Sequence, residues 1–261
     1  FRVIKHCNTE SRNLYAECLL KSLDRRLGGD GTWLPSGEDN KSAGERLLEC
    51  LATLFPNSTS SGDVIDDGSG LSHMNRLTAR TLANILNRAA TREWHQEWLQ
   101  TLAEGRASGT LANRFKSKPF DHCLVRGKSG YINGASTLAG QIDQDDGQHL
   151  TFAIMVKDFK SNIDAKRLHE SILAEAVREI PRASQGDERA LHLNPSKNHT
   201  FTNVYRAKAQ SSRQRADDQL ANAIDPKEPS AKIRQSSVHK GSNIFLTGTG
   251  VLLILLGIRL S

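Results

Sequence analysis

The chain is poor in aromatic side chains and in cysteine. Aromatics make up 5% of its 261 residues, and the four cysteines show neither CxxC pairs nor metal-finger spacing. This excludes a zinc finger and a disulfide framework, and it favours free thiols, with one disulfide allowed in an oxidising compartment. None of the nine histidines belongs to an HExxH motif. We therefore expect no metal site and no cofactor.

Apolar residues are also scarce, at 37% of the chain, which is low for a chain that folds throughout. Residues 1–180 carry 23 basic and 23 acidic side chains, so the net charge of +6 lies beyond residue 180. In that tail the charges are mixed and aromatics are sparse, with only Phe201 and Tyr205 before residue 243. We therefore expect residues 182–243 to be a polar linker or disordered tail and expect no nucleic-acid partner.

The chain has one long apolar run, Ile244–Ile258, within a C-terminal segment of residues 244–261. Its fifteen residues fall short of the roughly 20 that a spanning helix needs, so it is a marginal candidate for a membrane anchor. More basic residues precede the run than follow it, and the positive-inside rule would then put the preceding domain in the cytoplasm. A signal sequence would override that rule, so the residues present do not determine the localisation.

The first half of the chain has helical periodicity. Apolar residues recur at helical spacing from Leu14 to Leu27, before a Gly-Gly stop, and again over residues 43–54, before Pro-Asn. A third helix is expected around residues 82–86 and a fourth over 94–102, with its two tryptophans in the core.

After residue 118 the periodicity changes to that of strands. Short alternating apolar runs and polar connections predict three consecutive antiparallel strands, and a helical pattern follows. The expected elements are a strand at 123–125 leading into a turn at 128–130, strands at 135–142 and 150–156, and a helix at 165–180 stopped by Pro181. The predicted fold class is α/β of the α+β kind, an antiparallel sheet flanked by helices.

Two triplets stand out within this pattern, Ser11-Arg12-Asn13 and Lys128-Ser129-Gly130. Each triplet alone is weak evidence of function, but the two in this order match two of three signatures of penicillin-interacting serine enzymes. Further segments accompany them: Ser-Arg-Asn-Leu-Tyr-Ala-Glu (11–17), Asp-Gly-Ser-Gly-Leu-Ser (67–72) with Asn75, Gly-Thr-Leu (109–111) with Arg114, and Ser-Thr-Leu-Ala-Gly (136–140). Over roughly residues 1–180 this ensemble resembles the class C low-molecular-mass penicillin-binding proteins, the D-alanyl-D-alanine carboxypeptidase/endopeptidases.

The resemblance implies that residues 1–181 form the C-terminal part of a penicillin-binding protein/serine β-lactamase-like fold, with helices over 1–117 and the sheet and closing helix over 118–181. It implies a serine-type peptidase that acts on peptidoglycan stem peptides through an acyl-enzyme, takes β-lactams as inhibitors and works in the cell envelope or periplasm. In the family pattern a nucleophilic Ser-x-x-Lys precedes both triplets, so we expect it upstream of Phe1 and expect this chain alone to be inactive. Ser237–Lys240 also spells Ser-x-x-Lys, but it lies in the polar tail after both triplets.

The resemblance also implies roles for individual residues. The Ser11 hydroxyl would relay a proton to the leaving D-alanine nitrogen, and the Asn13 amide would bind the backbone of the acyl portion. Lys128 would be a fixed cation beside Ser11 that favours the substrate carboxylate.

The Ser129 hydroxyl would bind that carboxylate, Gly130 would let the substrate lie along the strand, and the Tyr131 N–H would complete an oxyanion hole. The family more usually has Lys-Thr-Gly-Thr here. Ser129 therefore lacks a methyl group and Tyr131 is bulky, which puts carboxylate binding in doubt.

Two alternative functions remain open. A non-catalytic peptidoglycan-binding relative is suggested by Ser129 and Tyr131, and a β-lactamase or esterase would share the fold. Away from the triplets, we interpret 67–72 as a tight turn with positive φ at Gly68 and Gly70, and Arg114 as a surface residue.

Overall fold

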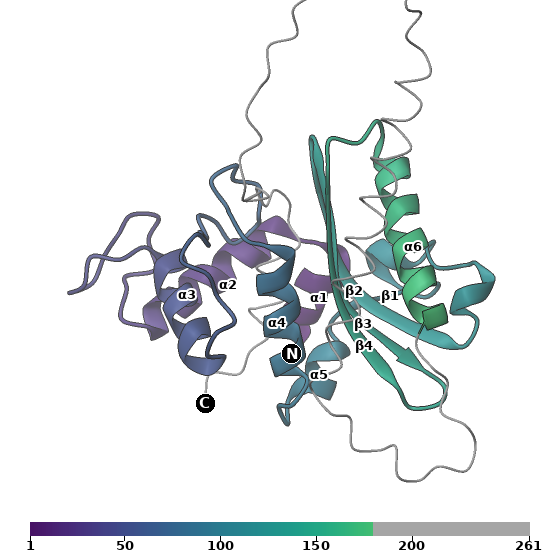
Figure 1. Ribbon diagram of the computed structural model, residues 1–261. Helices are drawn as coiled ribbons and strands as arrows, with labels where there is room; N and C mark the ends of the chain where they lie inside the picture. Colours follow the sequence, from purple (N-terminus) through teal and green to yellow (C-terminus); the bar gives the residue numbers. More distant parts are fainter. Residues whose placement is uncertain (180–261) are drawn as a thin grey trace, which may run out of the picture. The chain divides into compact units, whose positions relative to one another are not determined.

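The computed structural model describes residues 1–179 (Figure 1). The expected linker at 182–243, the apolar segment at 244–261 and Pro181 lie outside these residues. Within the described part, no helix is both long and apolar enough to cross a bilayer. The elements in chain order are α1 (Arg2–Glu10), α2 (Asn13–Arg26), α3 (Ala43–Leu54), α4 (Ala79–Ala89), α5 (His95–Leu99), β1 (Ala103–Glu104), the 3-10 turns η1 (Gly109–Leu111) and η2 (Lys118–Phe120), β2 (Cys123–Ile132), β3 (Ala135–Gln144), β4 (His149–Lys157) and α6 (Asn162–Glu179).

Helices α3 and α4 each begin at a residue whose side chain caps them. The Ser42 side chain accepts a hydrogen bond from the Glu45 N–H, and the Glu45 carboxylate accepts one from the Ser42 N–H, so a capping box begins α3. The Thr78 side chain accepts a hydrogen bond from the Thr81 N–H and so caps α4. The predicted helices at 14–27, 43–54 and 82–86 are confirmed as α2, α3 and α4. The fourth is shorter than predicted, because α5 ends at Leu99 and the chain then enters β1.

Four strands form one antiparallel sheet in the order β1-β2-β3-β4. The prediction that Lys-Ser-Gly is a turn is wrong. All ten residues of β2 pair with β3, and the chain reverses later, beside Gly134 at φ 84°. That reversal needs a residue that tolerates positive φ, which glycine does. The two-residue strand β1 was not predicted, because it is too short to show a pattern.

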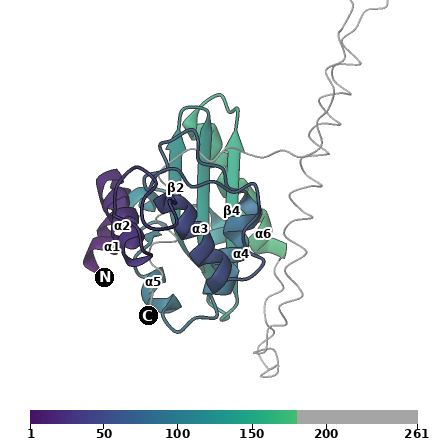
Figure 2. The ribbon, with the colours of Figure 1, turned by 90° about the vertical axis from the view of Figure 1, so that its left-hand side faces the viewer.

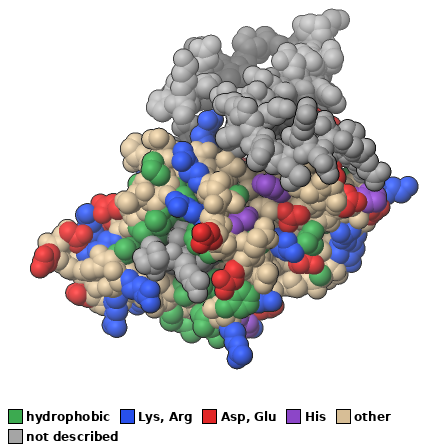
Figure 3. All heavy atoms as spheres, turned by 90° about the horizontal axis from the view of Figure 1, so that it is seen from below, with side chains coloured by type: hydrophobic (Ala, Val, Ile, Leu, Met, Phe, Trp, Pro, Cys, Tyr) green, Lys and Arg blue, Asp and Glu red, His purple; other side chains and the backbone are tan. Residues whose placement is uncertain are grey.

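Helices cover both faces of the sheet: α2, α3 and α4 lie on one side and α6 lies on the other (Figures 1 and 2). The core between the sheet and the α2–α4 side includes Leu51, Trp98 and Ala139, which confirms Trp98 as a core residue. The core on the other face includes Leu138 and Ile142. Acidic and basic side chains intermingle on the face shown in Figure 3, as the balanced charge of this region suggests.

Successive side chains of a strand point to opposite faces, so their alternation decides which of them face α2–α4 and which face α6. Ala139 belongs to the core on the α2–α4 side, whereas its neighbour Leu138 belongs to the opposite core. Lys128 pairs directly with Ala139, and directly paired residues share a face. The Lys128 side chain therefore points into the molecule on the α2–α4 side of the sheet, although it is a charged residue of a long strand.

Candidate active site

Lys128 is the most deeply buried cation of the site, with 1% of its surface exposed. Its ammonium nitrogen Nζ lies 2.8 Å from the Ser11 Oγ and 2.6 Å from the Ser129 carbonyl oxygen, and it donates a hydrogen bond to each. The two triplets found in the sequence, which are 117 positions apart, thus meet through their first residues. The roles of Ser11 and Lys128 in catalysis remain predictions.

Ser11 owes its position to a sharp turn between α1 and α2. Its backbone has φ 57° and ψ 49°, the left-handed region that a residue with a Cβ rarely adopts. The Cys7 carbonyl holds this turn by accepting the N–H groups of both Ser11 and Arg12. The Cys7 thiol also lies 3.6 Å from the Arg12 carbonyl oxygen. The turn presents the Ser11 hydroxyl to β2 while α2 starts immediately behind it.

Burial changes the acid–base character of Lys128. It lowers the pKa of the ammonium to about 7, against an ordinary value of 10.5, because the charged form loses its hydration and the hydrogen-bonded neighbours are a hydroxyl and a carbonyl. This differs from the expectation of a fixed cation: near neutral pH the amine is neutral in part of the molecules and can accept a proton. Burial also raises the pKa of the nearby Cys7 thiol to about 11, so this thiol stays protonated.

Asn13 is the first residue of α2 and comes two positions after Ser11. Its side-chain oxygen Oδ1 is buried and has no hydrogen-bond partner within residues 1–179. Since a buried unpaired carbonyl is costly, this atom is suited to accept a hydrogen bond from a bound molecule. Its predicted contact with a substrate backbone remains untested.

The other three predicted residues follow Lys128 along β2. The Ser129 hydroxyl donates to the Thr110 hydroxyl at 2.8 Å. Gly130 pairs with Thr137, whose buried Oγ1 has no partner in the described part of the chain. The Tyr131 ring is 46% exposed and lies 6.1 Å, centroid to centroid, from the Phe159 ring. Tyr131 is therefore partly exposed to solvent, between the buried residues Gly130 and Ile132.

Thr110 is a site residue that the sequence reasoning missed. Gly109-Thr-Leu was noted only as part of the family pattern, and nothing local indicates that its hydroxyl reaches Ser129. Gly109 has φ 54°, and a Cβ on it would lie 2.2 Å from the Thr9 carbonyl oxygen. Close packing of this loop on α1 thus places Thr110 beside the strand.

The segment 67–72 serves as scaffold. The Glu17 carboxylate accepts the backbone N–H groups of Gly68 and Ser69, and this ties the segment to α2. The turn interpretation holds for Gly70, with φ 76°, but not for Gly68, which does not have positive φ. Gly68 is required for another reason, since a Cβ there would lie 2.5 Å from the Ala16 carbonyl oxygen.

The interpretation of Arg114 as a surface residue is wrong. Only 6% of it is exposed, its Nε lies 2.9 Å from the Glu170 carboxylate, and it also donates to the Lys166 carbonyl. It therefore fastens the segment after η1 to α6. No group of three or more histidine, cysteine or acidic side chains within residues 1–179 is arranged to hold a metal ion. The four cysteines, all within residues 1–179, form no disulfide there.

Comparison with known proteins identifies a family. The sequence model of the D-Ala-D-Ala carboxypeptidase 3 (S13) family matches residues 1–178. A D-alanyl-D-alanine carboxypeptidase from Actinomadura sp. is 35% identical over 150 residues, which are 56% of this chain and 26% of that protein. Carboxypeptidase DacB from Mycolicibacterium smegmatis is 30% identical over 157 residues, which are 58% of this chain and 32% of that protein. The chain thus spans a quarter to a third of the length of these relatives.

The structure is also similar to solved structures. Penicillin binding protein 4 (dacB) from Haemophilus influenzae superimposes with a TM-score of 0.53 at 20% identity, over 67% of this chain and 39% of that chain. At this level of identity the likeness is one of fold.

Proposed function

Because this chain belongs to the D-Ala-D-Ala carboxypeptidase 3 (S13) family, we propose that it forms part of a serine peptidase that cleaves peptidoglycan stem peptides through an acyl-enzyme. The observation that carries the proposal is the hydrogen bond between Lys128 and Ser11. It joins a buried amine that titrates near neutral pH to a hydroxyl at the start of a helix, which is an arrangement suited to moving protons.

The reaction divides into two steps. The serine of the family's Ser-x-x-Lys attacks the carbonyl carbon of the penultimate D-alanine, an ester forms, and the bond to the nitrogen of the last D-alanine breaks. Ser11 passes its proton to that nitrogen, Lys128 reprotonates the Ser11 hydroxyl, and the proton that the attacking serine gives up returns Lys128 to its charged form. In the second step a water molecule attacks the ester carbonyl, the acyl group leaves as a carboxylic acid, and the serine regains a proton.

The substrate would lie along the outer edge of β2. Strand β1 pairs only with Arg126 and Gly127, so from residue 128 onward β2 has no strand neighbour on that side within residues 1–179. An extended peptide can bind such an edge through its main chain. The Tyr131 N–H would then meet the developing oxyanion, and the Ser129 hydroxyl, oriented by Thr110, would meet the terminal carboxylate.

The test uses the full-length protein that contains these residues, incubated with a fluorescent penicillin. Lys128→Ala should slow covalent labelling by about a hundredfold or more, because removing one preorganised polar contact typically costs about 3–4 kcal/mol in the transition state. Lys118→Ala, an exposed lysine near the start of β2, is the matched control and should label at the normal rate. Equal labelling rates in the two variants would contradict the proposed role of Lys128.

The same experiment separates the alternatives. A non-catalytic relative would bind peptidoglycan without forming a covalent adduct, and a β-lactamase would form the adduct and release the opened penicillin rapidly. The chain of 261 residues by itself should form no adduct, since the Ser-x-x-Lys of the family pattern would be missing from it.

The proposed substrate also suggests where the protein works. Peptidoglycan lies outside the cytoplasmic membrane, so we propose the cell envelope or periplasm as its location. The apolar segment Ile244–Ile258 would help to hold it there. Fractionation of cells that produce the protein with and without residues 244–261 tests both statements.

A further inference from the structure

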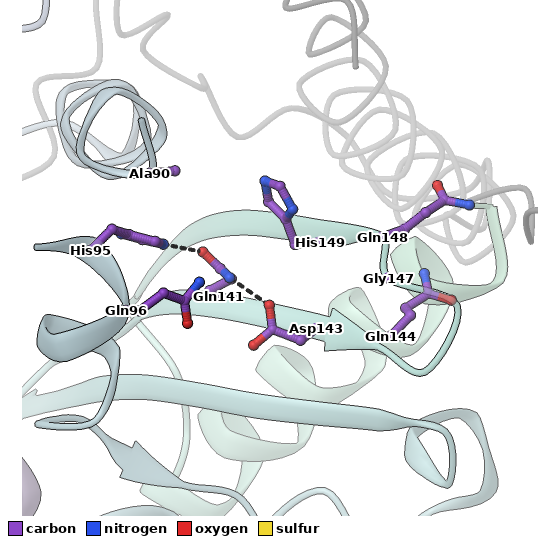
Figure 4. A pocket seen from close by; sticks show the side chains of 9 residues that line it. All are labelled: Ala90, His95, Gln96, Gln141, Asp143, Gln144, Gly147, Gln148 and His149. Atoms are coloured by element: carbon purple, nitrogen blue, oxygen red, sulfur yellow. Dashed lines mark hydrogen bonds between the residues drawn. The ribbon is translucent and has the colours of Figure 1, made fainter. Parts of the chain in front are cut away.

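A hollow lies on the same face of the sheet as Lys128, farther along the strands. It has a volume of about 270 Å³, and its walls come from the end of α4, the first turn of α5, β3 and the turn into β4 (Figure 4). Ala139 pairs with Lys128, and the hollow begins two residues farther on at Gln141, a distance of about 7 Å along a strand. None of the predicted active-site residues lines it.

A chain of hydrogen bonds runs across its floor. The His95 Nε2 lies 2.8 Å from the Gln141 Oε1, and the Gln141 amide nitrogen donates to Asp143 (Figure 4). Burial lowers the pKa of His95, so this imidazole is neutral at neutral pH. With Gln141 oriented by Asp143, the His95 Nε2 must carry the proton. Its Nδ1 is therefore a hydrogen-bond acceptor.

One buried atom of the hollow has no partner within residues 1–179. It is this Nδ1 of His95, a residue that is 4% exposed. Because leaving such an atom unpaired is costly, it is suited to accept a hydrogen bond from a bound molecule. A hydroxyl group or an amide N–H of a ligand can donate to it.

The charge of the hollow argues for a neutral ligand. Asp143 is its one carboxylate among the described lining residues, and it is already paired with Arg126, whose Nη1 lies 3.0 Å away. Lysine and arginine are absent from this lining. The remaining polar groups are planar amides and an imidazole, including Gln96 and His149, which are exposed. Such a lining offers many hydrogen bonds and little net charge.

We propose that this hollow binds one sugar unit of a peptidoglycan glycan strand through its hydroxyl and acetamido groups. The choice of polymer rests on the proposed function, because the glycan that carries the stem peptide is built of N-acetylated sugars. A neutral ring with hydroxyl and amide N–H groups complements the unpaired acceptor of His95, and the hollow shares a sheet face with the Ser11–Lys128 pair. Sugar binding there would hold the polymer while its peptide lies along β2.

The test is a nuclear magnetic resonance titration of the isotope-labelled chain with N-acetylglucosamine. Saturable shifts should appear at the side-chain amides of Gln96 and Gln141. His149→Ala and Gln96→Ala should each weaken binding by about tenfold or more. The matched controls are His73→Ala and Gln100→Ala, exposed residues of the same types outside the hollow, and they should leave the affinity unchanged.

Several results would overturn the inference: no saturable shift, equal weakening in the control variants, or stronger binding of glucose or inorganic phosphate than of N-acetylglucosamine. Penicillin labelling of the full-length protein is a separate readout. Normal labelling without sugar binding overturns this inference alone, and sugar binding without labelling overturns the proposed reaction instead.

Discussion

Two buried cations, Arg46 in the helical region and Lys128 in the sheet, have opposite kinds of partner. Arg46 is 3% exposed, and its guanidinium bonds to the carboxylates of Asp24 and Asp39 and to two backbone carbonyls. Lys128 is buried as deeply, but its amine donates to a hydroxyl and a carbonyl and has no hydrogen bond to a carboxylate within the described residues.

The difference lies in whether a charge is compensated. Arg46 is always charged and sits among opposite charges, so its place in the fold depends on keeping those partners. Lys128 can give up its proton, and its pKa near 7 is the result. A buried cation with carboxylate partners stabilises a structure, whereas one without them is free to exchange protons.

The largest effect that we expect, and the strongest test of this comparison, is the loss of stability when Arg46 is replaced. Arg46→Met should lower the free energy of unfolding by about 3–5 kcal/mol, because it leaves the buried Asp24 carboxylate without its charged partner. Urea denaturation measures this, and Arg80→Met, at an exposed position of α4, is the control. A loss no greater than that of the control would break the comparison.

A smaller effect should appear in the pH dependence of stability. The folded pKa of Lys128 is depressed to about 7, so between pH 7 and 9 the unfolded chain binds more protons at this residue than the folded one. The stability that Lys128 contributes should therefore rise by about 2–3 kcal/mol as the pH increases over these two units, and be lost as it falls back through 7.

Lys128→Met should remove this rise, while the exposed Lys118→Met should keep it. Denaturant unfolding at several pH values provides the measurement. It should stop at pH 9, because above that value the raised pKa of Cys7 acts in the opposite direction. Identical pH profiles for the two variants would show that Lys128 has an ordinary pKa.

The smallest effect concerns the backbone at Ser11. Both Ser11→Gly and Ser11→Ala remove the hydroxyl, but glycine tolerates the left-handed conformation, so Ser11→Gly should be the more stable by about 1 kcal/mol. Ser22, inside helix α2, should show the reverse order, with Ala more stable than Gly by about 1 kcal/mol. The same order at both positions, measured by thermal unfolding, would rule out strain at Ser11.

Local patterns predicted much of this fold. The helices α2, α3 and α4 follow from apolar spacing and end signals within each segment, and strands β3 and β4 follow from alternation. The helix α1 was missed, because the nine residues Arg2–Glu10 hold only three apolar side chains and bury only Cys7 and Asn8. Its contacts are with distant residues: Asn8 donates to the Thr101 hydroxyl, and Thr9 donates to the Thr101 carbonyl.

The pairing of Ser11 with Lys128 could be expected only through the family resemblance. The burial of individual residues of the site could not be predicted from the sequence at all. The burial of Lys128 inside a strand depends on a hydroxyl from the other end of the domain, and the burial of Arg114 depends on Glu170, 56 positions away. The sequence around a lysine or arginine does not indicate such distant partners. This is why the sequence suggested a turn and a surface residue.

Because Lys128 is buried, the rate at which its amine reacts can report local opening of the structure. At pH 8 this amine is mostly unprotonated and therefore reactive toward acylating reagents, but with 1% of its surface exposed it is shielded from them. An amine with the ordinary lysine pKa of 10.5 would be almost fully protonated at this pH and would react slowly. The rate at which a reagent modifies Lys128 thus reports how often the turn that carries Ser11 separates from β2, and a ligand that holds the turn in place would slow that rate.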